Sequence, residues 1–327
     1  MSIPKKIHFC WMSGDPYPDD IQRCIDLWHK YMPDYEYKLW DKNTFDSSKW
    51  RYTSEALSKK KYAFVSDVVR LYALYTEGGI YLDSDIEVFK SFDPLLDNPA
   101  FSGIESGGRL AAWMMASEAG NPLFKELLSY YDDKVFLSDD GSMDLTPNTI
   151  PTTRILSDHG MVHRNQLQKL DDITIYPEDY FCPKNPWTGK VTITDNTYAM
   201  HLFAGAWNDT ASDDLSFFGS VSDYVADLFT QSKIRTNEPC YVFGTGTVGN
   251  LVLEALRMNG AKIAGFIVSK RDTAWRDIDG IPILEVAECD ERVKQSDILI
   301  SVLPKGQKNL YEVLKKNGFT KLICVGE

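Results

Sequence analysis

Paired cysteines, long apolar runs and an excess of basic charge are all missing from this chain of 327 residues. The six cysteines form no C-x-x-C pair, which excludes a zinc ribbon or dithiol centre and favours reduced, buried thiols. No apolar run approaches the roughly 18 residues of a membrane-spanning helix, and the run 7–12 is too short for a signal-peptide core. We expect a cytoplasmic protein, and peripheral attachment to the inner face of a membrane stays open.

Basic residues are too few for a nucleic-acid-binding protein. The formal net charge is -12, whereas nucleic-acid phosphates select a basic surface, so we exclude nucleic acid as a partner. Residues 238–327 contain 12 acidic and 12 basic side chains, so the whole acidic excess lies before them. An acidic domain can still bind an anionic ligand through a divalent cation, because the ion reverses the local charge.

Apolar residues are present in the proportion of a globular protein, at 43% of the chain. The length predicts two domains, each with its own core. The polar link 231–239 lies where composition and charge balance change. We therefore predict a first domain over residues 1–236 and a second over residues 237–327.

The first domain is predicted to be α/β. A strand over 6–12, a helix that begins near Pro18 and a strand over 35–40 form a βαβ unit, which indicates a parallel sheet. A long helix follows, from Thr53 or Ser54 to the Gly78-Gly79 pair, and then one strand over 80–89. Further segments are expected as strands at 100–104, 111–116, 173–176 and 198–203, helices at 122–131 and 213–229, and a mobile loop at 132–144.

Two carboxylates follow the glycine pair, in the segment Gly78-Gly79-Ile80-Tyr81-Leu82-Asp83-Ser84-Asp85. On an extended chain residues i and i+2 face the same way, about 6.5 to 7 Å apart, so both acids would address one ligand. Carboxylates together with phosphate oxygens suit Mg²⁺ or Mn²⁺ better than Ca²⁺, which needs more oxygens. A bare D-x-D is more often a solvated strand end, so its context has to decide.

That context includes Asp67 and Arg70, which lie three residues apart on one face of the preceding helix. An exposed pair of this kind would contribute less than about 1 kcal/mol. Val65, Val68 and Leu71 surround the two residues with apolar side chains. Full exposure of that face is therefore not expected.

Four segments occur in an order seen in bacterial capsular-polysaccharide glycosyltransferases: Ile7-His8-Phe9-Cys10-Trp11, Ser66-Asp67-x-x-Arg70, Gly78 to Asp85, and His201-Leu202-Phe203-Ala204-Gly205-Ala206-Trp207. Over about residues 3–207 the chain resembles the DXD sugar-binding glycosyltransferase family. That family includes yeast α-mannosyltransferases and α-galactosyltransferases and is related to the clostridial toxin glucosyltransferases. The resemblance implies a GT-A fold and transfer of a hexose from a nucleotide-diphosphate sugar, with retention at the anomeric carbon.

The resemblance also implies roles for individual residues. Trp11 would stack on the nucleobase, while Asp67 and Arg70 would hold sugar hydroxyls. Asp83 would contact ribose and sugar and, with Asp85, the metal. Two further residues are expected from the last segment, His201 as a metal or phosphate ligand and Trp207 as an indole N–H donor to the departing diphosphate. From the residues alone, Trp11 is as readily a core aromatic and His201 as readily a structural histidine.

The implied function is a bacterial, metal-dependent, retaining transferase that uses Mn²⁺ or Mg²⁺ and a UDP-hexose such as UDP-glucose or UDP-galactose. Its acceptor would be a glycan or lipid-linked glycan of a surface polysaccharide. Asp67, Arg70, Asp83 and Asp85 are the catalytic candidates. We favour front-face transfer, in which the leaving phosphate takes the acceptor proton, over an enzyme nucleophile. We expect His8 to pack at the start of its strand rather than to bind metal. His29, His159 and His163 show no ligand-like spacing and are expected at the surface.

The second domain is predicted to be a smaller Rossmann-like α/β unit, with strands at 241–243, 263–268, 298–302 and 322–325 and a helix at 248–259. Gly244, Gly246 and Gly249 form a G-x-G-x-x-G turn between a strand and a helix, as a nucleotide-binding fingerprint requires. Where an NAD enzyme would place an acid, the chain has Ser269-Lys270-Arg271, which disfavours NAD and could suit a 2′-phosphate. A structural or partner-binding accessory is the alternative for this unit.

Two other functions stay open. A non-catalytic regulatory protein would bind a nucleotide through the second domain and a glycan through the first. A reductase would bind NADP(H) at Gly244 to Gly249. Cofactor binding by the second domain separates this last possibility from the transferase.

Overall fold

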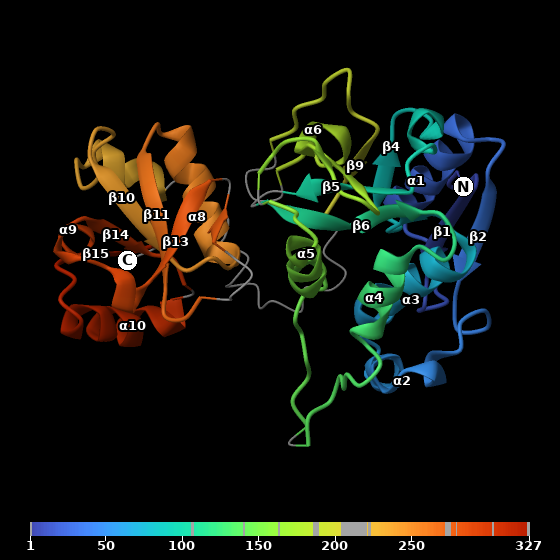
Figure 1. Ribbon diagram of the computed structural model, residues 1–327, viewed down its shortest axis with the longest axis horizontal. Coiled ribbons are helices and arrows are strands. Elements are labelled where there is room, and N and C mark those ends of the chain that lie inside the picture. Colours follow the sequence, from blue (N-terminus) through green and yellow to red (C-terminus); the bar gives the residue numbers. More distant parts are fainter. Residues whose placement is uncertain are drawn as a thin grey trace. The chain divides into compact units, whose positions relative to one another are not determined.

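The computed structural model describes residues 2–105, 108–139, 141–162, 164–185, 190–203, 221, 224–271, 276–278, 280–302 and 304–325. The chain forms two compact units, one built from residues up to 203 and the other from residues 221 onward (Figure 1). Each unit is an α/β domain, as predicted. Within the described segments, every helix is too short or too polar to cross a membrane.

The first unit is built on a seven-stranded sheet in the order β2-β1-β3-β6-β5-β8-β7. Its strands are β1 (Lys6–Cys10), β2 (Glu36–Trp40), β3 (Gly79–Leu82), β5 (Ala100–Glu105), β6 (Arg109–Ser117), β7 (Gln168–Lys169) and β8 (Thr174–Tyr176). Strands β1, β2 and β3 are parallel, and β6 is antiparallel to both β3 and β5. A separate two-stranded antiparallel sheet pairs β4 (Ile86–Val88) with β9 (Ala199–His201).

Helices cover both faces of the large sheet (Figure 1). They are α1 (Asp19–Tyr31), α2 (Arg51–Ser58), α3 (Tyr62–Glu77), α4 (Pro122–Ser129), α5 (Thr149–Asp158) and α6 (Glu178–Phe181), with short 3₁₀ turns at Ser47–Lys49 and Asp93–Leu95. Strand alternation divides the apolar residues between two cores. Tyr81 faces the core that contains α2, α3 and α4, whereas its neighbours Ile80 and Leu82 face the core that contains α1.

Two elements of the first unit that were predicted to be continuous are each divided in two. The predicted long helix is two helices, because the chain turns at Lys59–Lys61, where Lys60 has a left-handed φ of 57°. The predicted strand 80–89 is interrupted after Leu82 and resumes at Ile86. In the predicted mobile loop, Leu137 forms an antiparallel bridge with Met143.

The second unit has a six-stranded sheet in the order β12-β13-β11-β10-β14-β15. Its elements are β10 (Pro239–Phe243), α8 (Thr247–Met258), β11 (Lys262–Val268), β12 (Asp277–Ile278), β13 (Ile281–Glu285), a 3₁₀ turn (Val286–Glu288), α9 (Glu291–Lys294), β14 (Asp297–Ile300), α10 (Pro304–Lys316) and β15 (Lys321–Cys324). All strands but β12 run parallel. Numbered along the chain, these five lie in the order 3-2-1-4-5 of a doubly wound Rossmann sheet.

The structure divides the chain earlier than the predicted boundary between residues 236 and 237. Val221, Val225, Leu228 and Ile234 are buried in the core of the second unit, together with residues of α8 such as Leu251. The described residues of the predicted helix 213–229, Val221 and 224–229, therefore belong to the second unit, because their apolar side chains pack on its core. Residues 213–220, 222 and 223 lie outside the described part of the chain.

Candidate functional site

The candidate site lies at the edge where the parallel strands β1 and β3 end. These strands are neighbours, with Ile7 opposite Ile80 and His8 opposite Tyr81. Trp11 follows β1, and Asp83 follows β3. Ligands of open α/β sheets bind outside the carboxyl ends of such strands, so the edge is a suitable place for a nucleotide sugar.

The start of β3 is fixed by glycine and by a buried histidine. Gly79 has a φ of +110°, and a Cβ there would lie 2.7 Å from the Lys6 carbonyl oxygen. The His8 Nε2 donates to the Gly78 carbonyl at 2.8 Å, and the Trp40 indole N–H donates to the His8 Nδ1 at 3.1 Å. Burial lowers the pKa of His8 to about 4, so the ring is neutral. His8 is therefore structural and packs in its strand, as predicted.

Asp67, Arg70 and Asp83 meet in one cluster, in which Asp67 and Arg70 share one helix face as the sequence predicted. The Arg70 Nη2 lies 3.1 Å from Asp67 Oδ1 and 3.2 Å from Asp83 Oδ1. The Tyr81 hydroxyl donates to the same Asp83 oxygen at 3.0 Å. Arg70 also donates to the backbone carbonyls of Ser66 and Ala112. The guanidinium thus holds two carboxylates in place while its own donors are used within the protein.

Burial dominates the electrostatics of this cluster. Removal from water raises the pKa of Asp67 to about 7, even though Arg70 acts to lower it, and the Asp83 charge raises it further. Burial also raises the pKa of Asp83, again against Arg70. Two acids that share one guanidinium in a buried pocket compete for its positive charge. An added cation or hydroxyl donor would therefore be bound favourably here.

The D-x-D segment is a turn, which corrects the extended conformation predicted for it. The Ile86 N–H donates to the Asp83 carbonyl at 3.2 Å and closes the turn between β3 and β4. Asp83 points to Arg70, whereas the Asp85 Oδ1 accepts from the His201 Nε2 at 3.1 Å. The two acids therefore have different partners, because the turn breaks the strand alternation on which the prediction relied.

His201 is the buried partner of Asp85 and is surrounded by aromatic rings. Its ring centroid lies 4.8 Å from that of Trp113 and 4.2 Å from that of Phe203. Phe203 has a left-handed φ of 56°, which costs a bulky side chain about 1 to 2 kcal/mol. The His201 Nδ1 is buried and has no hydrogen-bond partner. A strained backbone and an unsatisfied buried nitrogen are features typical of a functional site.

The residues of this site partly fit a divalent cation. Asp85 Oδ1 and His201 Nε2 lie 3.1 Å apart, so an ion held by both would replace the hydrogen bond between them. Asp83 Oδ1 is already shared by Arg70 and Tyr81. Among the described residues, no three His, Cys, Asp or Glu side chains are grouped closely enough to hold a metal by themselves. A metal would thus need oxygens from a ligand in addition to Asp85 and His201, which is the usual arrangement for Mg²⁺.

The other predicted residues have different outcomes. Trp11 is half-buried, donates its indole N–H to the Asp15 carbonyl at 2.8 Å and packs edge-on against Tyr17. Trp207 and His163 lie outside the described residues. His159 is paired with Glu126 at the surface.

Sequence reasoning missed three residues that contact the predicted ones. Tyr81 donates to Asp83, Trp113 packs on His201, and Glu105 accepts the Trp113 indole N–H at 3.3 Å. Burial raises the pKa of Glu105, while Arg109, His201 and Trp113 act to lower it. Tyr81 could have been found because it lies two residues before Asp83 on the same strand. Nothing in the sequence indicated that β6 brings Trp113 to His201.

In the second unit the three glycines have distinct surroundings. Gly244 has a φ of +106°, and a Cβ on Gly249 would lie 2.1 Å from the Gly244 carbonyl oxygen, so these two glycines are required by packing. A Cβ on Gly246, at the start of α8, would meet nothing within 4 Å. Arg271 pairs with Glu288 at 2.9 Å and donates to the Ile283 carbonyl. The guanidinium is thus already used within the fold, which weakens the suggested contact with a 2′-phosphate.

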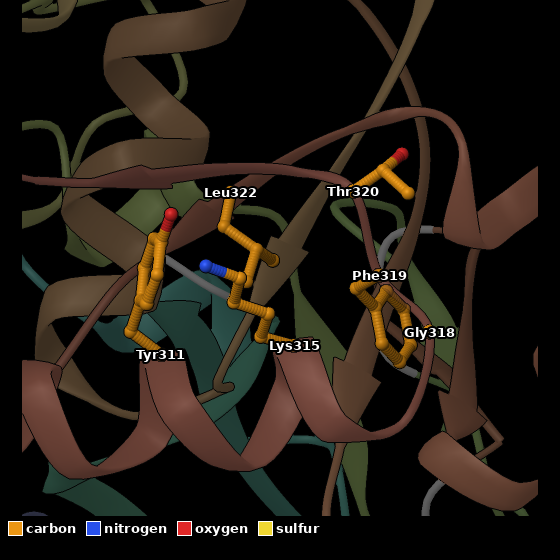
Figure 2. Close-up of a pocket in the computed structure, with 6 residues that line it drawn as sticks. All are labelled: Tyr311, Lys315, Gly318, Phe319, Thr320 and Leu322. Carbon is orange, nitrogen blue, oxygen red and sulfur yellow. The ribbon is translucent and has the colours of Figure 1, made fainter.

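A cavity of about 280 Å³ lies elsewhere in the second unit, between α10 and β15. Figure 2 shows its lining residues, Tyr311, Lys315, Gly318, Phe319, Thr320 and Leu322. None of the predicted site residues lines it. Its shape therefore gives no support to the predicted chemistry.

Comparison with known proteins finds relatives for part of the first unit. Residues 18–102 match the family described as the glycosyltransferase sugar-binding region containing a DXD motif, in agreement with the predicted resemblance. The chain is 31% identical over 134 residues to inositol phosphoceramide mannosyltransferase 3 of Schizosaccharomyces pombe, covering 39% of this chain and 36% of that protein. It is 31% identical over 145 residues to mannosyl phosphorylinositol ceramide synthase SUR1 of Saccharomyces cerevisiae, covering 41% and 37%.

The chain thus spans little more than a third of the length of these curated relatives. Among solved structures, the PaToxG glycosyltransferase is 22% identical, with a TM-score of 0.36 over 48% of this chain and 70% of that one. The glycosyltransferase GlyE of Streptococcus pneumoniae is 10% identical, with a TM-score of 0.36 over 98% and 91%.

Proposed function

Because residues 18–102 belong to the DXD-containing glycosyltransferase family, we propose that this chain transfers a hexose from a nucleotide-diphosphate sugar to a glycan or lipid-linked glycan. The reaction would proceed with retention, would use a UDP-hexose and would serve the synthesis of a bacterial surface polysaccharide, in the cytoplasm or at the inner face of the membrane. The observation that supports this proposal best is the buried Asp67–Arg70–Asp83 cluster beside the Asp85–His201 pair.

The carboxylates would bind the sugar end of the donor. Hydroxyl groups donate to carboxylates, so Asp67 and Asp83 are suited to sugar and ribose hydroxyls rather than to phosphate oxygens. Arg70 would orient these acids, because its donors are used by Ser66, Ala112 and the two carboxylates. Fixed acceptors of this kind place the anomeric carbon without reorganisation when the donor binds.

The diphosphate end requires positive charge. Asp85 and His201 would hold Mn²⁺ or Mg²⁺, which when bound would neutralise charge on the leaving diphosphate. Trp11, which follows β1 at the same sheet edge, would contact the nucleobase. The names of the fungal relatives add nucleotide-linked mannose to the donors worth testing.

A donor panel with matched variants tests the proposal. Donor hydrolysis and transfer would be measured with UDP-glucose, UDP-galactose and GDP-mannose, with Mn²⁺ and with a chelator. Asp85→Ala should lower turnover by at least about 100-fold, because removal of one electrostatic stabiliser commonly costs that much, and should leave the thermal melt nearly unchanged. Asp132→Ala, in the same unit, is the control. Wild-type turnover by the Asp85 variant would remove this acid from the mechanism.

A non-catalytic nucleotide-binding role for the second unit is the other candidate, favoured by the open space at Gly246 and the Rossmann strand order. Thermal shift with UDP and Mn²⁺, added together and separately, distinguishes the two, since ligands stabilise the state that they bind. A shift that needs both, together with donor hydrolysis, supports the transferase. A metal-independent shift without hydrolysis supports the regulatory protein. A rise in melting temperature with NADP(H) would favour the reductase instead.

A further inference from the structure

Glu105 is an acidic side chain at the end of β5 that the proposed mechanism leaves without a role. Its Oε2 accepts the indole N–H of Trp113 at 3.3 Å across the β5–β6 hairpin. Trp113 itself is only 4% exposed. An indole N–H has one donor and no acceptor, so this carboxylate accepts the one hydrogen bond that the buried ring can donate.

Trp113 in turn connects Glu105 to the candidate metal ligands. Its ring packs on the His201 imidazole, with centroids 4.8 Å apart and planes tilted by 33°. The His201 Nε2 lies 3.1 Å from Asp85 Oδ1. The Trp113 carbonyl also accepts the Asp83 N–H at 2.9 Å. One residue of β6 therefore contacts both the turn that carries the acids and the histidine that faces Asp85.

We propose that Glu105 is a positioning residue: through the Trp113 indole it sets the orientation of His201, and thereby the geometry of the Asp85–His201 pair. This inference rests on the proposed function for its significance, although the orientation itself can be measured without any activity. Groups that orient metal ligands affect metal affinity or activity about 10- to 100-fold when removed. Glu105 would act by accepting a hydrogen bond, so glutamine should replace it and alanine should not.

The chain offers a matched control for this experiment. Trp50 donates its indole N–H to Asp132 Oδ1 at 3.1 Å, a tryptophan–carboxylate pair that is part of a different contact in the same unit. Glu105→Ala and Asp132→Ala each remove one such acceptor. Only the first should affect His201.

Histidine NMR gives the direct readout. The chain has five histidines, and the signal lost in His201→Asn identifies the ring of interest. Glu105→Ala should move the His201 resonance in the direction seen in Trp113→Leu, because the ring-current contribution of Trp113 changes. Glu105→Gln, which removes the charge but keeps the acceptor, should move it much less than Glu105→Ala, and Asp132→Ala should leave it in place. An unmoved signal in Glu105→Ala, or an equal movement in Glu105→Gln, would overturn the proposal.

Mn²⁺ binding, followed by the loss of the free-ion EPR signal in the presence of UDP, provides the second readout. Glu105→Ala should raise the half-saturating Mn²⁺ concentration about 10-fold or more, and Glu105→Gln should restore it. Unchanged Mn²⁺ binding in Glu105→Ala would overturn the link to the metal. Failure of the wild type to hydrolyse any donor would refute the proposed transferase instead, and the two failures are thereby distinguished.

Discussion

The neutral histidine beneath the glycine pair makes the first unit sensitive to mild acid. His8 is fully buried, its Nε2 donates to the Gly78 carbonyl, and its Nδ1 accepts from Trp40. A second proton on Nδ1 would break the hydrogen bond from Trp40. Burial lowers its pKa from 6.5 to about 4. The unfolded chain therefore takes up the proton at a higher pH than the folded one, and the unfolded state gains stability as the pH falls.

The sign and size of the effect follow from these two values. Above pH 6.5 the histidine is neutral in both states and contributes nothing to the pH dependence. Between pH 6.5 and 4 the folded state loses stability, by about 2 kcal/mol at pH 5 and about 3 kcal/mol at pH 4 and below. A loss of this size is a large part of the free energy of unfolding of an ordinary domain.

Urea denaturation at pH 7 and pH 5, followed by tryptophan fluorescence, measures this loss. The comparison is with His8→Gln, which keeps an amide donor and an acceptor but does not titrate in this range. The free energy of unfolding should fall by about 2 kcal/mol more in the wild type than in the variant between these two pH values. Equal falls in the two proteins would refute the assignment of His8 as the neutral group.

Two further substitutions test other parts of the structure. Arg70→Lys keeps the charge but loses the planar fork, whose Nη2 contacts Asp67 and Asp83 while Nε and Nη1 donate to backbone carbonyls. The kcat/KM for the donor should fall about 10-fold or more because a lysine cannot make all of these contacts, and wild-type kinetics would show that the fork is dispensable. Gly249→Ala places a Cβ against the Gly244 carbonyl and should lower the melting temperature of the second unit by several degrees, with a cost of about 1 to 3 kcal/mol. An unchanged melt would contradict the close packing of α8 on the turn.

Local sequence signals predicted the elements of the site better than their arrangement. The i, i+3 spacing of Asp67 and Arg70 correctly placed both on one buried helix face, because helix geometry alone decides that. The same reasoning failed for Asp85, since an extended chain was assumed where the Ile86 N–H closes a turn. The partner of Asp85 could not be read locally either, because His201 reaches it through the pairing of β4 with β9, more than 100 residues away.

Long-range packing also explains what was missed. Glu105 and Trp113 are ordinary residues of a hairpin by sequence, and they become relevant only because β6 lies beside β3 and its tryptophan reaches His201. Long-range packing also explains why the structural boundary between the two units lies before the predicted one. Val225 and Leu228 form a helical apolar stripe that either core could have accepted, and only the structure shows that the second one does.

Asp85 and His201 are 116 residues apart. The sugar-binding region matched by residues 18–102 therefore contains Asp85 but not His201. His201, the partner of Asp85, lies on β9, which follows all strands of the seven-stranded sheet along the chain. A fragment limited to the recognised region would retain both acids of the D-x-D turn yet leave Asp85 without its imidazole. The Asp85–His201 pair therefore requires the fold of the first unit from β3 to β9.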